Sequence, residues 1–260
     1  LVYVTGKTGR GKSVFANQLA LSLAHNATVG GCPTAVYSME MQRDSVLRRW
    51  LANLSRVPTR AIRSGRIDDE QAGAIAAGIS RLDTEYNLFV SSFRRWTTAS
   101  LRADLWRLKN EHGVNFFVLD YMEKIKDDIW GAKPHERSAE ISDRLQDMVG
   151  ELGLTGVVIQ RLNKEGQSGE VAESHHMAGS MQLAFDSDLT IIVQDFIPRN
   201  DSEKMIGDEK KRNLVTLTLS KVREEAATRY VHLVKDAGFP AFKNYCSPKS
   251  APPPNVTLTR

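Results

Sequence analysis

The eight residues from Gly6 to Ser13 constrain the fold more strongly than any other part of the sequence. They match the phosphate-loop pattern G-x-x-x-x-G-K-[ST]. Such a loop must lie between a buried strand and a helix, because its backbone N–H groups and the helix N-terminus converge on one phosphate. An apolar run at residues 1–4 supplies the strand, with no lead-in before it, as expected of an excised domain. We therefore expect an α/β fold built around this loop.

Every residue of the loop is expected to contact the phosphates of a bound nucleotide. These residues are Gly6, Lys7, Thr8, Gly9, Arg10, Gly11, Lys12 and Ser13. Lys12 supplies a positive charge at the β- and γ-phosphates, and the Ser13 hydroxyl binds Mg²⁺, which takes few protein ligands and keeps several waters. The sequence thus predicts a nucleoside triphosphate and Mg²⁺ as ligands.

Short apolar runs recur along the chain and predict further strands. Each run is continuous rather than alternating, which is typical of parallel strands buried on both faces. They lie at residues 35–38, 87–90, 116–119, 157–159 and 189–193. Helical patterns separate them, the clearest running from Ile141 to Leu152 with apolar residues at helical spacing. Residues 214–222 and 229–234 follow without a helix between them, so they predict an antiparallel pair at the sheet edge.

The composition is typical of a globular protein, and the low number of cysteines is typical of a reducing compartment. Hydrophobic residues make up 41% and charged residues 25%, and the only cysteines, Cys32 and Cys246, are too few for a disulfide framework or a metal site. No apolar stretch approaches the roughly 18 residues of a membrane span. We expect a cytosolic protein with one domain at residues 1–244 and a disordered, proline-rich tail at residues 245–260.

The charge is mildly basic, with a formal net charge of +4 that suits a nucleic-acid partner without requiring one. Residues 43–66 hold seven arginines and one acid, Asp44. This segment is either a solvated helix face or a contact for phosphates.

Two carboxylates are candidates for the chemistry of hydrolysis. Asp120 ends the apolar run at residues 116–119, where a carboxylate would reach the metal ion opposite Ser13. Glu40 ends the run at residues 35–38 and is placed to orient or deprotonate the attacking water. The alternative for Glu40 is an acid in the first turn of the next helix, which the helix dipole favours.

Four stretches resemble the C-terminal ATPase domain of DnaB-type replicative helicases, a group that includes phage primase-helicases and Twinkle. They are Tyr37-Ser38-Met39-Glu40-Met41 with the following helix, the run from Leu101 to Asp120-Tyr121, the segment from Glu136 to Leu162-Asn163-Lys164, and Ser220-Lys221-Val222-Arg223. They follow the family's order across nearly the whole chain. The resemblance implies a RecA-like fold.

The resemblance also implies an assembly and a set of roles. It implies a homo-hexameric ring that binds ATP between subunits, moves on single-stranded DNA and unwinds duplex. Glu40 matches the catalytic glutamate and Arg49 a residue that packs on the nucleotide base. Lys221 and Arg223 match a basic pair that enters the neighbour's site, with Arg223 as the arginine finger. Primase and a helicase loader become candidate partners, in the cytoplasm of a bacterium or a phage-infected host cell.

Three departures from the family pattern leave roles open. Arg161 stands where the family has a γ-phosphate-sensing glutamine, and Gln160 precedes it, so the sensor has either shifted or been replaced. The finger is followed by Glu224-Glu225-Ala226-Ala227 in place of a turn with glycine. The expected DNA loop has His176, Gly179 and Ser180 in a less charged segment, which is either a phosphate contact or a flexible surface loop.

Two other functions fit the phosphate loop and the fold. A RecA- or RadA-like recombinase would form filaments and exchange strands, and a KaiC-like scaffold would bind ATP without needing DNA. ATPase stimulation by single-stranded DNA separates the motors from the scaffold. Unwinding of a forked duplex separates a helicase from a recombinase.

Overall fold

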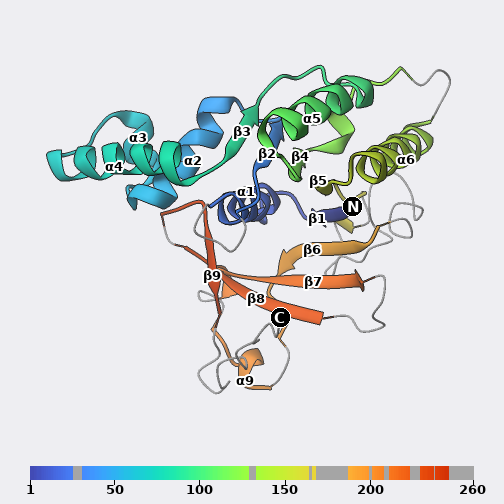
Figure 1. The fold of residues 1–260 in the computed structure, drawn as a ribbon. Coiled ribbons are helices and arrows are strands. Elements are labelled where there is room, and N and C mark those ends of the chain that lie inside the picture. Colours follow the sequence, from blue (N-terminus) through green and yellow to red (C-terminus); the bar gives the residue numbers. More distant parts are fainter. Residues whose placement is uncertain are drawn as a thin grey trace, which may run out of the picture.

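The structure is a computed structural model that describes residues 1–25, 31–128, 133–163, 166–167, 187–198, 201–207, 211–222, 229–236 and 238–245. Within these residues nine strands form one sheet in the order β3-β2-β4-β5-β1-β6-β7-β8-β9 (Figure 1). The strands are β1 (Val2–Gly6), β2 (Thr34–Ser38), β3 (Leu88–Ser91), β4 (Phe116–Asp120), β5 (Thr155–Ile159), β6 (Leu189–Asp195), β7 (Leu214–Val222), β8 (Arg229–Lys235) and β9 (Phe242–Asn244). The helices are α1 (Lys12–Leu23), α2 (Arg43–Ser55), α3 (Thr59–Ser64), α4 (Asp69–Glu85), α5 (Thr98–His112), η1 (Met122–Lys124), α6 (Pro134–Leu152) and α9 (Asp201–Lys204).

The sheet has a parallel part and an antiparallel part. Strands β3, β2, β4, β5, β1 and β6 pair in parallel, and β7, β8 and β9 continue the sheet in antiparallel pairs. The predicted α/β fold with an antiparallel C-terminal pair is therefore confirmed. Although β1 is the first strand in the chain, it lies between β5 and β6. The phosphate loop consequently leaves the interior of the sheet.

Burial on both faces of the sheet explains the continuous apolar runs. In β4, Phe117 and Leu119 pack with residues of α5 and α6, whereas Phe116 and Val118 pack with residues of α1 and α2. All five residues of β4 are buried. Asp120 is carried to the end of this strand by a segment that has no solvated face.

The short strand β9 was not predicted, and it replaces β8 as the edge of the sheet. Its three residues are too few to produce a recognisable period. Phe242 donates its backbone N–H to Gln18 Oε1 at 2.7 Å and accepts a hydrogen bond from Gln18 Nε2 at 2.9 Å. The strand is thus fixed by a side chain of α1 as well as by its pairing with β8.

The helices follow the predicted patterns where the structure describes them. In α6, Ile141, Leu145, Met148 and Leu152 are buried, as their spacing predicts. Among the described residues, none of the helices combines the length and hydrophobicity that a membrane crossing requires. The predicted tail falls outside these residues from position 246 onward.

Candidate nucleotide site

The phosphate loop depends on glycine for its conformation at Gly6, Gly9 and Gly11. All three have positive φ angles, of 147°, 78° and 102° respectively. A Cβ atom on Gly6 would lie 2.0 Å from the carbonyl oxygen of Val193, and one on Gly11 would lie 2.6 Å from the Phe242 ring. Gly11 also caps α1 without a side-chain hydrogen bond, which leaves the first N–H groups of the helix available to an anion.

Lys12 is held within the loop by its own backbone. Its Nζ donates to the carbonyl oxygens of Gly6 at 2.7 Å and of Lys7 at 3.2 Å. Burial is the main cause that lowers the pKa of this ammonium group, while the charge of Asp120 opposes the shift. Lys7 and Arg10 instead direct their side chains to Asp195, at 3.9 and 2.9 Å. These two residues can therefore contribute to phosphate binding chiefly through their backbone.

Asp120 is a buried carboxylate with few hydrogen-bond donors around it in the described structure. It is 1% exposed, and neither of its oxygens has a partner in the described part of the chain. Burial is the main cause that raises its pKa, and the Ser13 hydroxyl is close enough to oppose this shift. A buried carboxylate without donors is costly unless a cation compensates it. The pair of Ser13 and Asp120 therefore fits Mg²⁺.

The number of protein ligands agrees with this metal. Among the described residues, no group of three or more His, Cys, Asp or Glu side chains could hold an ion. Mg²⁺ usually keeps several waters and takes only one or two carboxylates from the protein. A site built from one carboxylate and one hydroxyl is thus consistent with Mg²⁺ bound together with substrate phosphates.

One cleft of about 290 Å³ brings together many of the predicted residues, although Gly6, Lys7, Arg10 and Gln160 do not line it. Its walls include the loop residues Thr8, Gly9, Gly11, Lys12 and Ser13, together with Glu40, Arg49, Asp120, Tyr121 and Arg161. Strand β2 ends at Ser38, as predicted, and Glu40 lies in the bend two residues beyond the strand. Helix α2 begins only at Arg43 with Asp44 in its first turn, which also excludes Glu40 from that turn.

Comparison with known proteins identifies the family. Residues 1–244 match the model of the family described as DnaB-like helicase C terminal domain. The chain belongs to this family. It is 25% identical over 260 residues to the replicative DNA helicase DnaB of Buchnera aphidicola subsp. Schizaphis graminum (strain Sg), covering 96% of this chain and 52% of that protein. It is 26% identical over 211 residues to DnaB of Haemophilus influenzae, covering 78% of this chain and 44% of that protein.

This DnaB-like chain thus spans about half the length of the relatives it matches. Two solved structures share its fold. One is a DnaB-like replicative helicase described with its interactions with primase, at a TM-score of 0.80, 18% identity and coverage of 94% of this chain and 58% of that one. The other is described as an ATPase domain, at a TM-score of 0.81, 18% identity and coverage of 94% of this chain and 84% of that one. Family membership favours the replicative helicase motor over the recombinase and the KaiC-like scaffold.

The DnaB-like domain places Arg161, and not Gln160, in the cleft. The Arg161 guanidinium lies 4.2 Å from the centre of the Tyr121 ring and 3.9 Å from a Glu40 oxygen. Gln160 is fully buried, and its backbone N–H donates to Val4 at 3.0 Å. The sequence could not decide between Gln160 and Arg161 because both directly follow β5. Only the orientation of this strand in the sheet determines which side chain points into the core and which into the cleft.

Glu123 borders the site and was not predicted from the sequence. Its Oε1 accepts a hydrogen bond from the Arg161 backbone N–H at 2.9 Å, and its Oε2 is buried without a partner in the described residues. Burial is the main cause that raises the pKa of this carboxyl group. The available signal was an acid three residues after Asp120, directly beyond a buried strand.

Other family positions are only partly described. Arg49 lines the cleft, and burial is the main cause that lowers its pKa. The backbone of Lys221 lies in β7 opposite Thr190. Arg223 and the expected DNA-binding residues His176, Gly179 and Ser180 lie outside the described residues. The roles of all these residues stay predictions.

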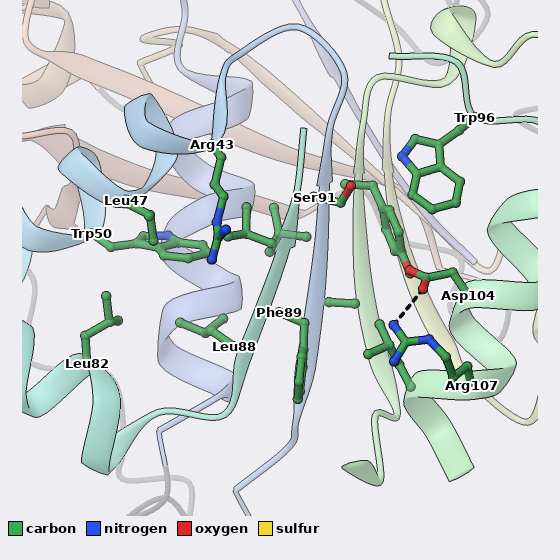
Figure 2. A pocket seen from close by; sticks show the side chains of 15 residues that line it. Arg43, Leu47, Trp50, Leu82, Leu88, Phe89, Ser91, Trp96, Asp104 and Arg107 are labelled. Atoms are coloured by element: carbon green, nitrogen blue, oxygen red, sulfur yellow. Dashed lines mark hydrogen bonds and ion pairs between the residues drawn. The ribbon is translucent and has the colours of Figure 1, made fainter. Parts of the chain in front are cut away.

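A larger hollow of about 430 Å³ lies along the edge strand β3. Figure 2 shows Arg43, Leu47 and Trp50 on one side of β3, and Trp96, Asp104 and Arg107 on the other. Asp104 already accepts hydrogen bonds from Tyr37 and from Arg107, both at 2.8 Å. This hollow contains no residue of the phosphate loop. The smaller cleft is therefore the candidate site for nucleotide chemistry.

Proposed function

We propose that this domain hydrolyses ATP with Mg²⁺ and is the motor of a replicative DNA helicase. The observation that carries the proposal is the meeting of Lys12, Ser13, Asp120 and Glu40 in one cleft of a DnaB-family chain. Separate segments bring these residues together at the carboxyl ends of β1, β2 and β4. Ligands of parallel α/β sheets bind at this edge.

The residues of the cleft would have separate roles during hydrolysis. The loop N–H groups and Lys12 would bind and orient the phosphates, and Ser13 and Asp120 would hold Mg²⁺. When bound, the metal ion would neutralise charge that develops on the phosphate oxygens. Glu40 has a side chain that is 54% exposed, so water can reach its carboxylate and be oriented or deprotonated there.

Arg161 is the proposed contact for the γ-phosphate. Its guanidinium is 53% exposed and lies in the cleft, and the Tyr121 ring and the Glu123 carboxylate fix its side chain and backbone. A guanidinium can bind phosphate oxygens through two parallel hydrogen bonds, which a neutral glutamine cannot match in charge. Arg49 is proposed to pack on the nucleotide base.

The remaining machinery is proposed at the level of the family. We propose a homo-hexameric ring in which Arg223, assisted by Lys221, completes the site of the neighbouring subunit. Single-stranded DNA would pass along a loop containing His176, Gly179 and Ser180. Primase is a proposed partner because a related structure is described with it, and a helicase loader is a further one. Bacterial relatives suggest action in the cytoplasm of a bacterium or a phage-infected cell.

The direct test of the proposal is Glu40→Gln. The amide can still bind a water molecule but cannot accept its proton, so ATP should bind with near wild-type affinity while hydrolysis is lost. Fluorescent-nucleotide binding and phosphate release measure the two properties separately. The control is Glu70→Gln, which removes an exposed carboxylate in the first turn of α4. Near wild-type phosphate release by Glu40→Gln would place the base elsewhere.

A further inference from the structure

The connection between β3 and α5 presents an aromatic ring beside two arginines that form no ion pair with the described residues. Residues 93–96 read Phe93-Arg94-Arg95-Trp96, and Phe93 is 54% exposed. This segment follows β3, which neighbours β2 in the sheet, while β2 in turn neighbours β4. Because these strands are parallel, the segment lies at the same sheet edge as Glu40 and Asp120. The proposed nucleotide chemistry does not use it.

The exposed ring stands on a fixed base. The centres of the Phe93 and Trp96 rings are 5.5 Å apart, those of Trp96 and Tyr37 are 5.2 Å apart, and the rings of each pair are nearly perpendicular. Tyr37 is buried and donates a hydrogen bond to Asp104. Figure 2 shows Trp96 on the same side of β3 as Asp104 and Arg107. These perpendicular ring contacts hold the Phe93 ring in place before any ligand arrives.

The loop after β4 brings another exposed cationic residue next to this segment of the chain. The backbone N–H of Lys126 donates to the Trp96 carbonyl at 2.8 Å, which ties the segment after β4 to the segment after β3. Arg94, Arg95 and Lys126 are exposed, and within the described residues none of the three has an ion pair.

Acidic groups near this surface are largely occupied. The carboxylate of Asp127 accepts hydrogen bonds from Thr98 at 2.7 and 2.6 Å and an ion pair from Arg144 at 2.8 Å. Asp128 is exposed, but its single negative charge is outnumbered by the three positive charges of Arg94, Arg95 and Lys126. The surface around Phe93 is therefore positively charged as well as aromatic.

A second exposed aromatic side chain provides the contrast. Trp106 on α5 is 59% exposed and has Arg102 and Arg107 beside it. There, however, Arg102 is paired with Glu151, and Arg107 with Asp104 and Glu111. The composition is similar around both rings, but only the arginines beside Phe93 are free of ion pairs in the described structure.

We infer that Phe93, Arg94, Arg95 and Lys126 form a binding site for single-stranded nucleic acid, separate from the nucleotide cleft. A base would stack on the exposed ring, and the flanking phosphates would meet the cations. Stacking on an aromatic ring tolerates every base, and phosphate contacts ignore sequence, as a strand-tracking motor requires. The inference rests on the proposed function for the choice of ligand, because an acidic protein surface would also be attracted to the cations.

The test measures binding of a fluorescein-labelled oligothymidine to the whole chain by anisotropy. Phe93→Ala should weaken binding roughly 5-fold to 150-fold, the range associated with losing one stacked base, and Phe93→Tyr should restore it. The double variant Arg94→Ala/Arg95→Ala should reduce the salt slope by about 1.4, since each phosphate contact on a single strand contributes about 0.7. Thermal melting would confirm that each variant is folded.

Trp106→Ala and Arg102→Ala are the controls and should leave the affinity and salt slope unchanged. The inference is overturned if Phe93→Ala binds oligothymidine like the wild type, or if Trp106→Ala loses as much. An unchanged salt slope in Arg94→Ala/Arg95→Ala would also overturn it, because the arginines would then contact no phosphate.

The failure of this inference can be told apart from failure of the proposed function. Basal ATPase without DNA should be unchanged in Phe93→Ala, because Phe93 does not line the nucleotide cleft. If Phe93→Ala loses binding but the wild type has no ATPase activity, the nucleic-acid site stands and the motor function is wrong. Normal ATPase with unaltered binding in Phe93→Ala would retain the ATPase and reject the site.

Discussion

Replacing Gly11 by alanine should distort the phosphate loop through one identifiable collision. The new Cβ would lie 2.6 Å from one atom of the Phe242 ring and 3.2 Å from another, and φ at this position is 102°. Backbone strain of this kind costs about 1–3 kcal/mol, and forcing a packed ring aside costs about 1–3 kcal/mol more. Together they predict a loss of about 2–6 kcal/mol in the free energy of unfolding.

Gly9→Ala is the control because it shares the strain but not the collision. Gly9 has φ of 78°, and nothing lies within 4 Å of its added Cβ. Urea titration of the nucleotide-free protein should therefore show a smaller loss, of about 1–3 kcal/mol. Combining Gly11→Ala with Phe242→Leu should recover part of the difference, as expected for two residues in contact. Equal losses for the Gly9 and Gly11 variants, or strictly additive effects in the double variant, would refute the collision.

Three further predictions concern the chemistry of the cleft. Asp120→Asn should abolish Mg²⁺-dependent hydrolysis yet raise the stability of the nucleotide-free domain by about 1–3 kcal/mol at pH 7, because it removes a buried charge without donors. Burial raises the pKa of Asp120, so the wild-type domain loses stability as the pH rises through that pKa. The stability gained by Asp120→Asn, measured by urea titration, should therefore shrink at lower pH. A gain that grows on acidification would contradict this prediction. Arg161→Ala should slow single-turnover hydrolysis more than Arg161→Lys does, and Gln160→Ala should mainly lower the melting temperature; the reverse order would return the sensor role to Gln160. Arg223→Ala should reduce ATPase activity by about 10³- to 10⁵-fold and Lys12→Ala should abolish it, and mixing the two proteins should restore activity at interfaces that join an intact Lys12 to an intact Arg223. If no activity returns in rings shown to be mixed, the site is not shared between subunits.

Local features of the sequence were sufficient to predict the phosphate loop and the strands that carry Asp120 and precede Glu40. The loop is defined by eight consecutive residues, and β4 is buried on both faces, so each leaves a continuous signal. Strand β7 also begins and ends at the predicted residues. These features require no knowledge of distant parts of the chain.

Features that depend on distant contacts could not be predicted in this way. β9 is fixed by Gln18, which lies 224 positions away from Phe242 in the chain. The wall behind Gly6 is the backbone of Val193, and the partner of the Arg161 backbone is Glu123. The placement of Arg161 in the cleft also depends on how β5 is turned within the sheet. None of these relations leaves a local pattern in the sequence.

The interior position of β1 has a consequence for the order of events on the ribosome. The strand that leads into the phosphate loop is synthesised well before its neighbours β5 and β6, which begin at Thr155 and Leu189. At about 5–20 residues per second, β1 must wait roughly 8–30 s for its first partner strand. During that interval the nascent chain carries the complete phosphate-loop sequence without the sheet that shapes it. Nascent chains arrested before β5 should therefore be unable to retain ATP, and the ability to bind it should appear only late in synthesis.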